Sequence, residues 1–231
     1  MSVFCLVHGS TQSPEGWKLL VSELKARGHD CICVDLPTDQ PDSSATAYAR
    51  AIGKAVEKST SPIIVAHSAS GLFLPLVPEY AAVARLVYLA AVIPVPGESF
   101  LSQFQRDQEM YRPDFVGKDP TKDEALARQY LFHDCPPDVG QWALSTLRMM
   151  FAKRAIVERS PLAGWPNVPS SYISCREDRA LNPDWWETAA RERLRADPVR
   201  IEAGHAPHVS QPVALATILD SLASLDVMAP A

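Results

Sequence analysis

Ser68, Asp178 and His205 are three polar residues, each of which comes shortly after a strand-like apolar run. A serine hydroxyl is a poor nucleophile at neutral pH, so it needs a histidine as base and a carboxylate that orients this histidine. Because parallel strands end at the same edge of a sheet, we expect the three side chains to meet there as a catalytic triad. The apolar runs that precede them are Pro62–Ala66, Ser170–Cys175 and Val199–Glu202.

The segment around Ser68 has the composition of a nucleophile elbow, a tight turn from a strand into a helix with the nucleophile at its apex. Bulky neighbours would clash in such a turn, and the flanking positions hold the small residues Ala66 and Ser70. The usual motif has glycine at both positions, so this segment alone also fits a serine that caps an ordinary βα turn. The amide of Ala69 is expected at a helix N-terminus, where it would bind a developing oxyanion.

The loop after the first strand-like run is expected to supply the second amide of an oxyanion hole. It begins with His8 and Gly9, and the backbone N–H of Ser10 is the predicted donor. A tight βα turn would explain the same dipeptide. The glycine spacing of a dinucleotide fingerprint or a Walker motif is absent.

Two neighbours of the predicted triad offer alternatives. Glu177 could replace Asp178 as the acid, but Asp178 is the one followed directly by a helix-entry run. His208 could replace His205 as the base. We favour His205 because Gly204 is expected to form a sharp turn that lets its imidazole reach across the top of the sheet.

Alternating apolar runs and amphipathic segments predict the elements that position these residues: six parallel strands covered on both faces by helices. The strands are expected at Val3–Val7, Cys31–Val34, Pro62–Ala66, Arg85–Val92, Ser170–Cys175 and Val199–Glu202. The helices are expected at Pro14–Arg27, from Ser43 or Ser44 to about Lys58, from the elbow to about Val77, from Asp184 to about Arg195, and at Gln211–Leu222.

Residues 94–165 interrupt this alternation and contain no strand-like run. Long structureless loops are uncommon in compact domains, so this segment should form helices. We predict a small helical cap over a pocket, between a first core part (1–93) and a second (166–231), although a peripheral layer with its own core would have the same composition. His133 is expected at its surface. Its apolar large residues are Phe104, Met110, Tyr111, Phe115, Tyr130, Phe132, Trp142, Met149, Met150 and Phe151.

The composition of the 231-residue chain, 47% hydrophobic and 21% charged, is typical of one globular domain with a large core. The net charge is −5 and no basic stripe is present, so a nucleic-acid partner is not expected. The N-terminus lacks the pattern of a signal peptide, and the most apolar segment, Ala81–Pro96, is too short and broken to span a bilayer. The five cysteines are expected to be buried and reduced, which predicts a cytoplasmic location and no metal.

Taken together, these motifs resemble the α/β-hydrolase superfamily, and within it the branch of methylesterases and hydroxynitrile lyases. The resemblance spans the whole chain and implies an α/β-hydrolase fold with about six parallel strands and a small helical cap. It also implies that the two N-terminal antiparallel strands of larger relatives are missing. The matching stretches are Val7-His8-Gly9 with Trp17 downstream, Ala66-His67-Ser68-Ala69-Ser70-Gly71, Glu177-Asp178, and Gly204-His205 with Ser210-Gln211-Pro212.

This branch contains enzymes that hydrolyse esters and enzymes that cleave carbon–carbon bonds without a cofactor. The lyases typically have threonine where this chain has Gly9, and lysine where it has Ala206, so the resemblance favours hydrolysis. We therefore expect a serine hydrolase that cleaves a small carboxylic ester through an acyl-enzyme intermediate. The alternatives are a lyase or acyl-transfer enzyme on the same triad, and a non-catalytic ligand-binding homologue.

The expected partner is a small-molecule ester, with neither cofactor nor metal, nucleic acid nor membrane, and a homodimer is left open. An apolar or aromatic acyl or alcohol group would suit the aromatic composition of the predicted cap. The residues expected to line the substrate pocket are Gly9, His67, Phe104 and Trp142.

Overall fold

The fold is built on one sheet of six parallel strands in the order β2-β1-β3-β4-β5-β6. The computed structural model describes residues 1–37, 40, 42–148 and 152–227. The predicted fold class is confirmed, and two strands have the predicted bounds to the residue. The strands are β1 (Val3–Val7), β2 (Asp30–Val34), β3 (Ile63–His67), β4 (Arg85–Leu89), β5 (Ser170–Cys175) and β6 (Val199–Ile201).

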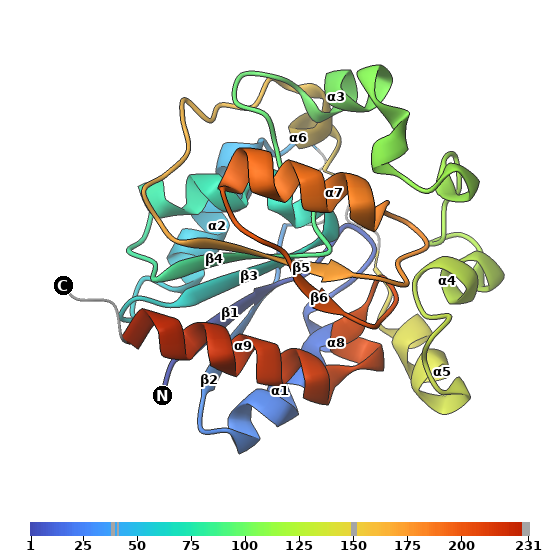
Figure 1. The fold of residues 1–231 in the computed structure, drawn as a ribbon, viewed down its shortest axis with the longest axis horizontal. Coiled ribbons are helices and arrows are strands. Elements are labelled where there is room, and N and C mark those ends of the chain that lie inside the picture. Colours follow the sequence, from blue (N-terminus) through green and yellow to red (C-terminus); the bar gives the residue numbers. More distant parts are fainter. Residues whose placement is uncertain (38–39, 41, 149–151, 228–231) are drawn as a thin grey trace.

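Helices cover both faces of this sheet (Figure 1). One face packs against α1 (Lys18–Ala26) and α9 (Pro212–Val227), and the other against α2 (Ala45–Ala55) and α7 (Pro183–Ala189). Successive side chains of a strand point to opposite faces, so β1 divides its apolar residues between the two layers. Phe4 and Leu6 belong to the α1/α9 layer, and Cys5 and Val7 belong to the α2/α7 layer.

Local sequence determines where the flanking helices begin and end. The side chain of Ser44 caps α2 by accepting a hydrogen bond from the Ala47 amide at 3.2 Å. Beyond α1, Gly28 has a φ of +82°, a conformation that glycine adopts without strain. A π-helix at Ala190–Leu194 continues α7 toward Arg195.

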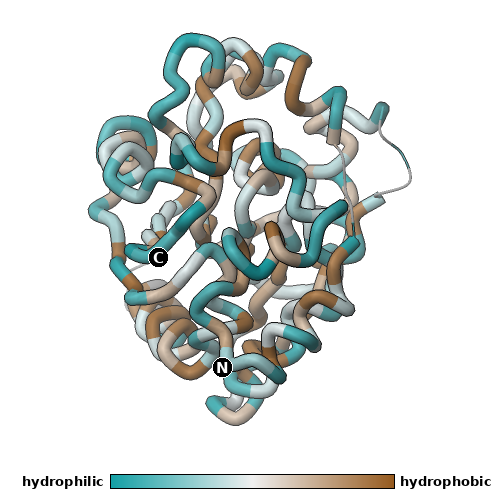
Figure 2. The backbone as a smooth tube through the Cα atoms, turned by 90° about the vertical axis from the view of Figure 1, so that its right-hand side faces the viewer, coloured by the Kyte–Doolittle hydropathy of each residue, from teal (hydrophilic) through white to brown (hydrophobic). Residues whose placement is uncertain are grey.

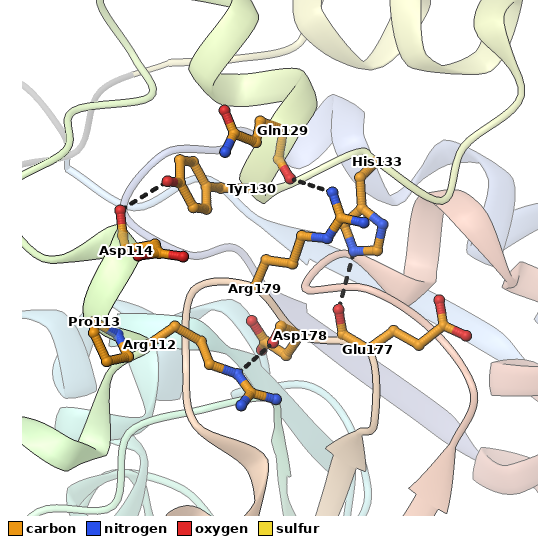
Figure 3. A pocket seen from close by; sticks show the side chains of 9 residues that line it. All are labelled: Arg112, Pro113, Asp114, Gln129, Tyr130, His133, Glu177, Asp178 and Arg179. Atoms are coloured by element: carbon orange, nitrogen blue, oxygen red, sulfur yellow. Dashed lines mark hydrogen bonds between the residues drawn. The ribbon is translucent and has the colours of Figure 1, made fainter.

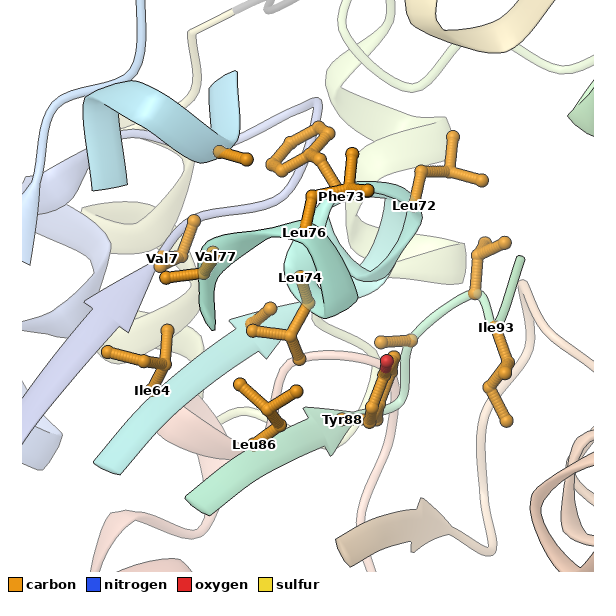
Figure 4. Packing of buried hydrophobic residues seen from close by; sticks show 14 of the residues in the cluster. Val7, Ile64, Leu72, Phe73, Leu74, Leu76, Val77, Leu86, Tyr88 and Ile93 are labelled. Atoms are coloured by element: carbon orange, nitrogen blue, oxygen red, sulfur yellow. The ribbon is translucent and has the colours of Figure 1, made fainter. Parts of the chain in front are cut away.

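The helix predicted after the elbow is replaced by two short 3-10 helices, Ser68–Leu72 and Leu74–Glu79. Pro75 and Pro78 lack the N–H groups that a continuous α-helix would need. Figure 4 shows how this segment still serves the core, because its apolar side chains pack over those of the neighbouring strands. The labelled residues there include Leu72, Phe73, Leu74, Leu76 and Val77 above Val7, Ile64 and Leu86.

Residues 94–165 are called the insertion from here on. In Figure 1 its part at 124–145 lies at the end of the sheet toward which the strands point, whereas its helices at Phe100–Arg106 and Lys153–Val157 lie beyond the layer of α2 and α7. The described part of the insertion contains helices and no named strand, although Tyr111 forms an isolated antiparallel bridge with Leu181. The boundaries of the insertion stay a prediction, and Met149, Met150 and Phe151 lie outside the described residues. Its helices are α3 (Phe100–Arg106), α4 (Glu124–Tyr130), α5 (Pro137–Ser145) and α6 (Lys153–Val157), with 3-10 helices at Gln108–Met110 and Pro113–Phe115.

Hydrophilic and hydrophobic stretches alternate along the whole trace in Figure 2, with no continuous hydrophobic band in that view. Within the described ranges, none of the helices has the length and apolar character needed to cross a bilayer. All five cysteines are free thiols. Cys5 and Cys175 are buried as expected, whereas Cys31, Cys33 and Cys135 are only half-buried.

Candidate active site

Ser68, His205 and Asp178 form a hydrogen-bonded row at the carboxyl ends of β3, β6 and β5. The Nε2 atom of His205 lies 3.0 Å from Ser68 Oγ, and its Nδ1 atom lies 2.7 Å from Asp178 Oδ2. An ionised carboxylate only accepts hydrogen bonds, so Nδ1 carries the proton and Nε2 is left to accept the Ser68 hydroxyl. The arrangement is therefore able to remove the proton from the serine.

Ser68 occupies a strained backbone conformation directly after β3. Its φ of +56° lies in the left-handed region, which costs a non-glycine residue about 1–3 kcal/mol. The Ser68 carbonyl is held by a hydrogen bond from the Val92 amide at 3.0 Å. Such strain persists only where the surroundings impose it, which is the backbone geometry expected of an elbow.

The two positions where the elbow motif usually has glycine accommodate their side chains. Ala66 is buried in β3, and the buried Ser70 hydroxyl donates to the His8 carbonyl at 2.5 Å, which ties the elbow to the end of β1. The glycine that this backbone requires is Gly71. A Cβ there would lie 2.0 Å from the Val92 carbonyl oxygen, closer than any real contact.

Asp178 is a buried carboxylate with a full set of donors. Its Oδ1 atom accepts from the amides of Ala180 (2.7 Å) and Leu181 (2.9 Å), and its Oδ2 atom faces His205. Arg112, from the insertion, donates through Nε to the Asp178 carbonyl at 3.1 Å (Figure 3). Because buried charge is stable only when it is hydrogen-bonded, these contacts fix the carboxylate in its orientation toward His205.

The structure does not bring the two alternative residues into the row. Glu177 is exposed, and Figure 3 shows its carboxylate directed away from Asp178. His208 is fully buried, and neither of its ring nitrogens has a hydrogen-bond partner among the described residues.

A cluster of buried aromatic rings, formed by Trp17, His67 and His208, packs beside His205. The centroid of the His67 ring is 4.8 Å from that of His205 and 4.9 Å from that of His208, and Trp17 contacts His208 in a tilted arrangement with 4.3 Å between centroids. Desolvation lowers the pKa of His208 to about 3 and lowers the pKa of His67 well below its ordinary value. Both imidazoles are therefore neutral near pH 7. The sequence does not predict this ring cluster.

His67 also holds the backbone of the base. Its Nε2 atom lies 2.8 Å from the His205 carbonyl oxygen, so the ring donates a proton to it. His8 makes a similar bridge between loops, because its Nδ1 faces the Gly9 carbonyl at 2.9 Å and its Nε2 accepts from the Leu36 amide at 3.3 Å.

The predicted role of Gly204 is wrong. Its φ is not positive, so no left-handed turn requires glycine here. Glycine is needed instead because the insertion approaches closely: a Cβ would lie 2.6 Å from Asp134 Oδ1 and 2.8 Å from His133 Nε2. His133 is half-buried rather than at the surface, and its Nε2 contacts the Glu177 carbonyl at 3.0 Å.

Of the two amides predicted to bind the oxyanion, one adjoins Ser68 in the chain and the other follows a residue that approaches Ser68 in space. Ala69 follows it directly, at the start of a helix that is 3-10 rather than α. Ser10 follows Gly9, where a Cβ would lie 2.9 Å from Ser68 Cβ. The role of both amides stays a prediction.

The residues predicted to line one substrate pocket lie at different places. Gly9 and His67 adjoin the nucleophile, as described above. Phe104 lines a cavity of about 230 Å³ with Phe100, Tyr111 and Phe115, whereas Trp142 lines another of about 730 Å³ near Ser13. A third, polar cavity of about 610 Å³ adjoins the Asp178 loop (Figure 3). Within the described ranges, no group of His, Cys, Asp or Glu side chains is placed to hold a metal ion.

Several known proteins are similar to this chain in sequence or in fold. The model of the alpha/beta hydrolase family matches residues 6–218. The alpha/beta hydrolase nvfD of Aspergillus novofumigatus is 28% identical in an alignment 232 positions long, and this alignment covers 90% of each chain. The fold is similar to that of polyneuridine aldehyde esterase (20% identity, TM-score 0.79, 96% of this chain and 99% of the other). It is also similar to that of a methylesterase protein from Arabidopsis (20% identity, TM-score 0.75, 97% of this chain and 100% of the other).

Proposed function

Since the chain belongs to the alpha/beta hydrolase family, we propose that it is a serine hydrolase that cleaves a small carboxylic ester. The observation that carries this proposal is the row from Ser68 through His205 to Asp178, with distances of 3.0 and 2.7 Å. The printed names of two structural neighbours, an esterase and a methylesterase, support the ester class. We place the chain in the methylesterase branch on the same grounds.

Acylation begins when His205 Nε2 takes the proton of Ser68 as Oγ attacks the ester carbonyl carbon. The oxyanion that forms is bound by the amides of Ser10 and Ala69. The imidazolium, stabilised by Asp178, gives its proton to the leaving alkoxide, and the alcohol departs. Water then attacks the acyl-enzyme with His205 as base, which releases the acid and restores Ser68.

Hydrolysis is favoured over lyase chemistry by the two positions that distinguish the branches. A threonine at Gly9 would place its Cβ 2.9 Å from Ser68 Cβ and 3.0 Å from His67 Nδ1. Ala206 is fully buried in an apolar cluster with Leu131 and Phe132, where a lysine ammonium would be desolvated.

The insertion acts as a cap that shapes the substrate pocket, with the aromatic cavity at Phe104 as the site for an apolar acyl or alcohol group. The chemistry needs no cofactor or metal, and the reduced cysteines suit a cytoplasmic enzyme.

Hydrolysis of short p-nitrophenyl esters by the wild type and by Ser68→Ala tests the proposal. We expect turnover that the substitution lowers by about 10⁴-fold or more, because the nucleophile and base act as a unit. Absence of turnover in a folded wild-type protein, or equal turnover by both proteins, would contradict it.

A further inference from the structure

Two adjacent residues of the insertion contact the two loops that carry the base and the acid. Asp134 Oδ2 accepts a hydrogen bond from the Gly204 amide at 2.7 Å, one residue before His205. His133 Nε2 faces the Glu177 carbonyl at 3.0 Å, one residue before Asp178 (Figure 3). A single turn between α4 and α5 therefore bridges both loops.

The contact surface at Gly204 leaves no space for a side chain. A Cβ on this residue would meet Asp134 Oδ1 at 2.6 Å and His133 Nε2 at 2.8 Å, and both atoms would have to move. Gly204 is buried and its φ is not positive. The turn of the insertion, rather than the backbone conformation, is the feature that requires glycine.

Apolar packing holds the same turn in place on both sides. Leu131 and Phe132, just before it, form a buried cluster with Ala206 and Val209, just after His205. Asp134 Oδ1 is buried without a hydrogen-bond partner among the described residues. A buried carboxylate oxygen without a donor is unfavourable, so stability alone does not account for this side chain.

We propose that Asp134 is a positioning residue for His205, which it holds through the Gly204 amide. The inference rests on the proposed function, because it assigns His205 the role of base. The α4–α5 turn then supports the catalytic residues, because it cannot move away without breaking its contacts with the loops of His205 and Asp178. The aromatic side of the insertion contacts only the loop of the acid among these two loops in the described residues: Arg112 donates to the carbonyls of Asp178 (3.1 Å, through Nε) and Ala180 (2.9 Å, through its amide).

The test compares Asp134→Ala, Asp134→Asn and the control Asp138→Ala, an exposed carboxylate in the first turn of α5. Two rates are measured: phosphonylation of Ser68 by an alkyl fluorophosphonate, and ester turnover with kcat and KM separated. Asp134→Ala should slow phosphonylation and kcat by about 10-fold or more with KM unchanged, since a small misplacement of a catalytic group carries a large penalty in rate. Asparagine keeps an acceptor for the Gly204 amide, so Asp134→Asn should remain within about 3-fold of the wild type, as should Asp138→Ala.

Gly204→Ala gives a second test that leaves Asp134 intact and does not depend on whether Asp134→Ala folds. It should reproduce the loss of rate, and the double variant Asp134→Ala/Gly204→Ala should be no slower than the worse single variant, because the two changes disturb one contact. Wild-type rates in both single variants, or an Asp134→Asn rate as low as that of Asp134→Ala, would overturn the proposal. Phosphonylation without ester turnover would refute the proposed ester function and still leave this inference tested.

Discussion

The loop that carries His205 is held by the core on one side and by the insertion on the other, through hydrogen bonds of similar length. In the core, His67 Nε2 donates to the His205 carbonyl at 2.8 Å. In the insertion, Asp134 accepts from the Gly204 amide at 2.7 Å. The first contact comes from the residue next to the nucleophile, whereas the second comes from a distant turn. Two regions that are distant in the sequence therefore jointly position one imidazole.

Substitution of Asp178, which belongs to the core, should have the largest effect on kcat. Asp178→Asn keeps the shape of the side chain but presents an amide that favours the wrong tautomer of His205, so kcat should fall by about 10⁴-fold. Steady-state kinetics and circular dichroism measure the rate and the fold. Glu177→Gln is the matched control, because this neighbouring carboxylate is exposed and should leave kcat near that of the wild type. A loss at Glu177 equal to that at Asp178 would refute the assignment of the acid.

Substitution of His67 compares its contact with the His205 carbonyl directly with the contact of Asp134, and should have an intermediate effect on kcat. His67→Phe keeps a ring between His205 and His208 but loses the donor to the His205 carbonyl, so kcat should fall by about 10²-fold, more than for Asp134→Ala. The orphaned buried carbonyl should also lower the free energy of unfolding by about 1–3 kcal/mol. Kinetics and urea denaturation measure both quantities. A smaller kinetic loss at His67 than at Asp134 would reverse the comparison and make the insertion the principal support.

Substitution of His208 in the ring cluster should change the pH dependence of the unfolding free energy with little effect on the rate. The pKa of His208 falls from an ordinary 6.5 to about 3 on folding, because burial disfavours its charged form. Between these values the unfolded state binds more protons, so the contribution of His208 to stability is complete above pH 6.5 and is lost as pH falls. His208→Phe should therefore reduce the slope of the unfolding free energy between pH 4 and 6 by about 1.4 kcal/mol per pH unit.

Urea denaturation at several pH values measures this slope. Trp17→Phe is the control, since it alters packing against the same ring without changing a titratable group. It should lower stability at every pH and leave the slope unchanged. An unchanged slope in His208→Phe would show that His208 is not the group that titrates.

The core was predictable from sequence because its signals are local and repeated. Short strand-like runs predict β1 and β5 to the residue, and small residues around Ser68 predict the elbow. The sequence does not predict features that depend on contacts between residues distant in the chain. Gly71 is needed because of the Val92 carbonyl, and Gly204 because of Asp134, and neither partner is near in sequence. The elements of the insertion are short helices without a strong period, so the sequence does not predict the contact of Asp134 with the Gly204 amide.

The same limit applies to the candidate pocket. Phe104 and Trp142 are both large and apolar, which predicts a shared pocket, but composition carries no information on which helix faces which cavity. The structure places them in separate cavities. By contrast, the order of Ser68, Asp178 and His205 after three parallel strands constrains their meeting point through topology alone.

Trapping of the acyl-enzyme tests directly whether Ser68 is the nucleophile. The wild type is mixed with p-nitrophenyl acetate, quenched in acid within the first turnover, and analysed by intact mass and peptide mapping. We expect a burst of about one equivalent of p-nitrophenolate and one acetyl group on the peptide that contains Ser68, both absent in Ser68→Ala. Turnover without this adduct, or an acetyl group on another residue that persists in Ser68→Ala, would contradict the assignment of Ser68 as the nucleophile.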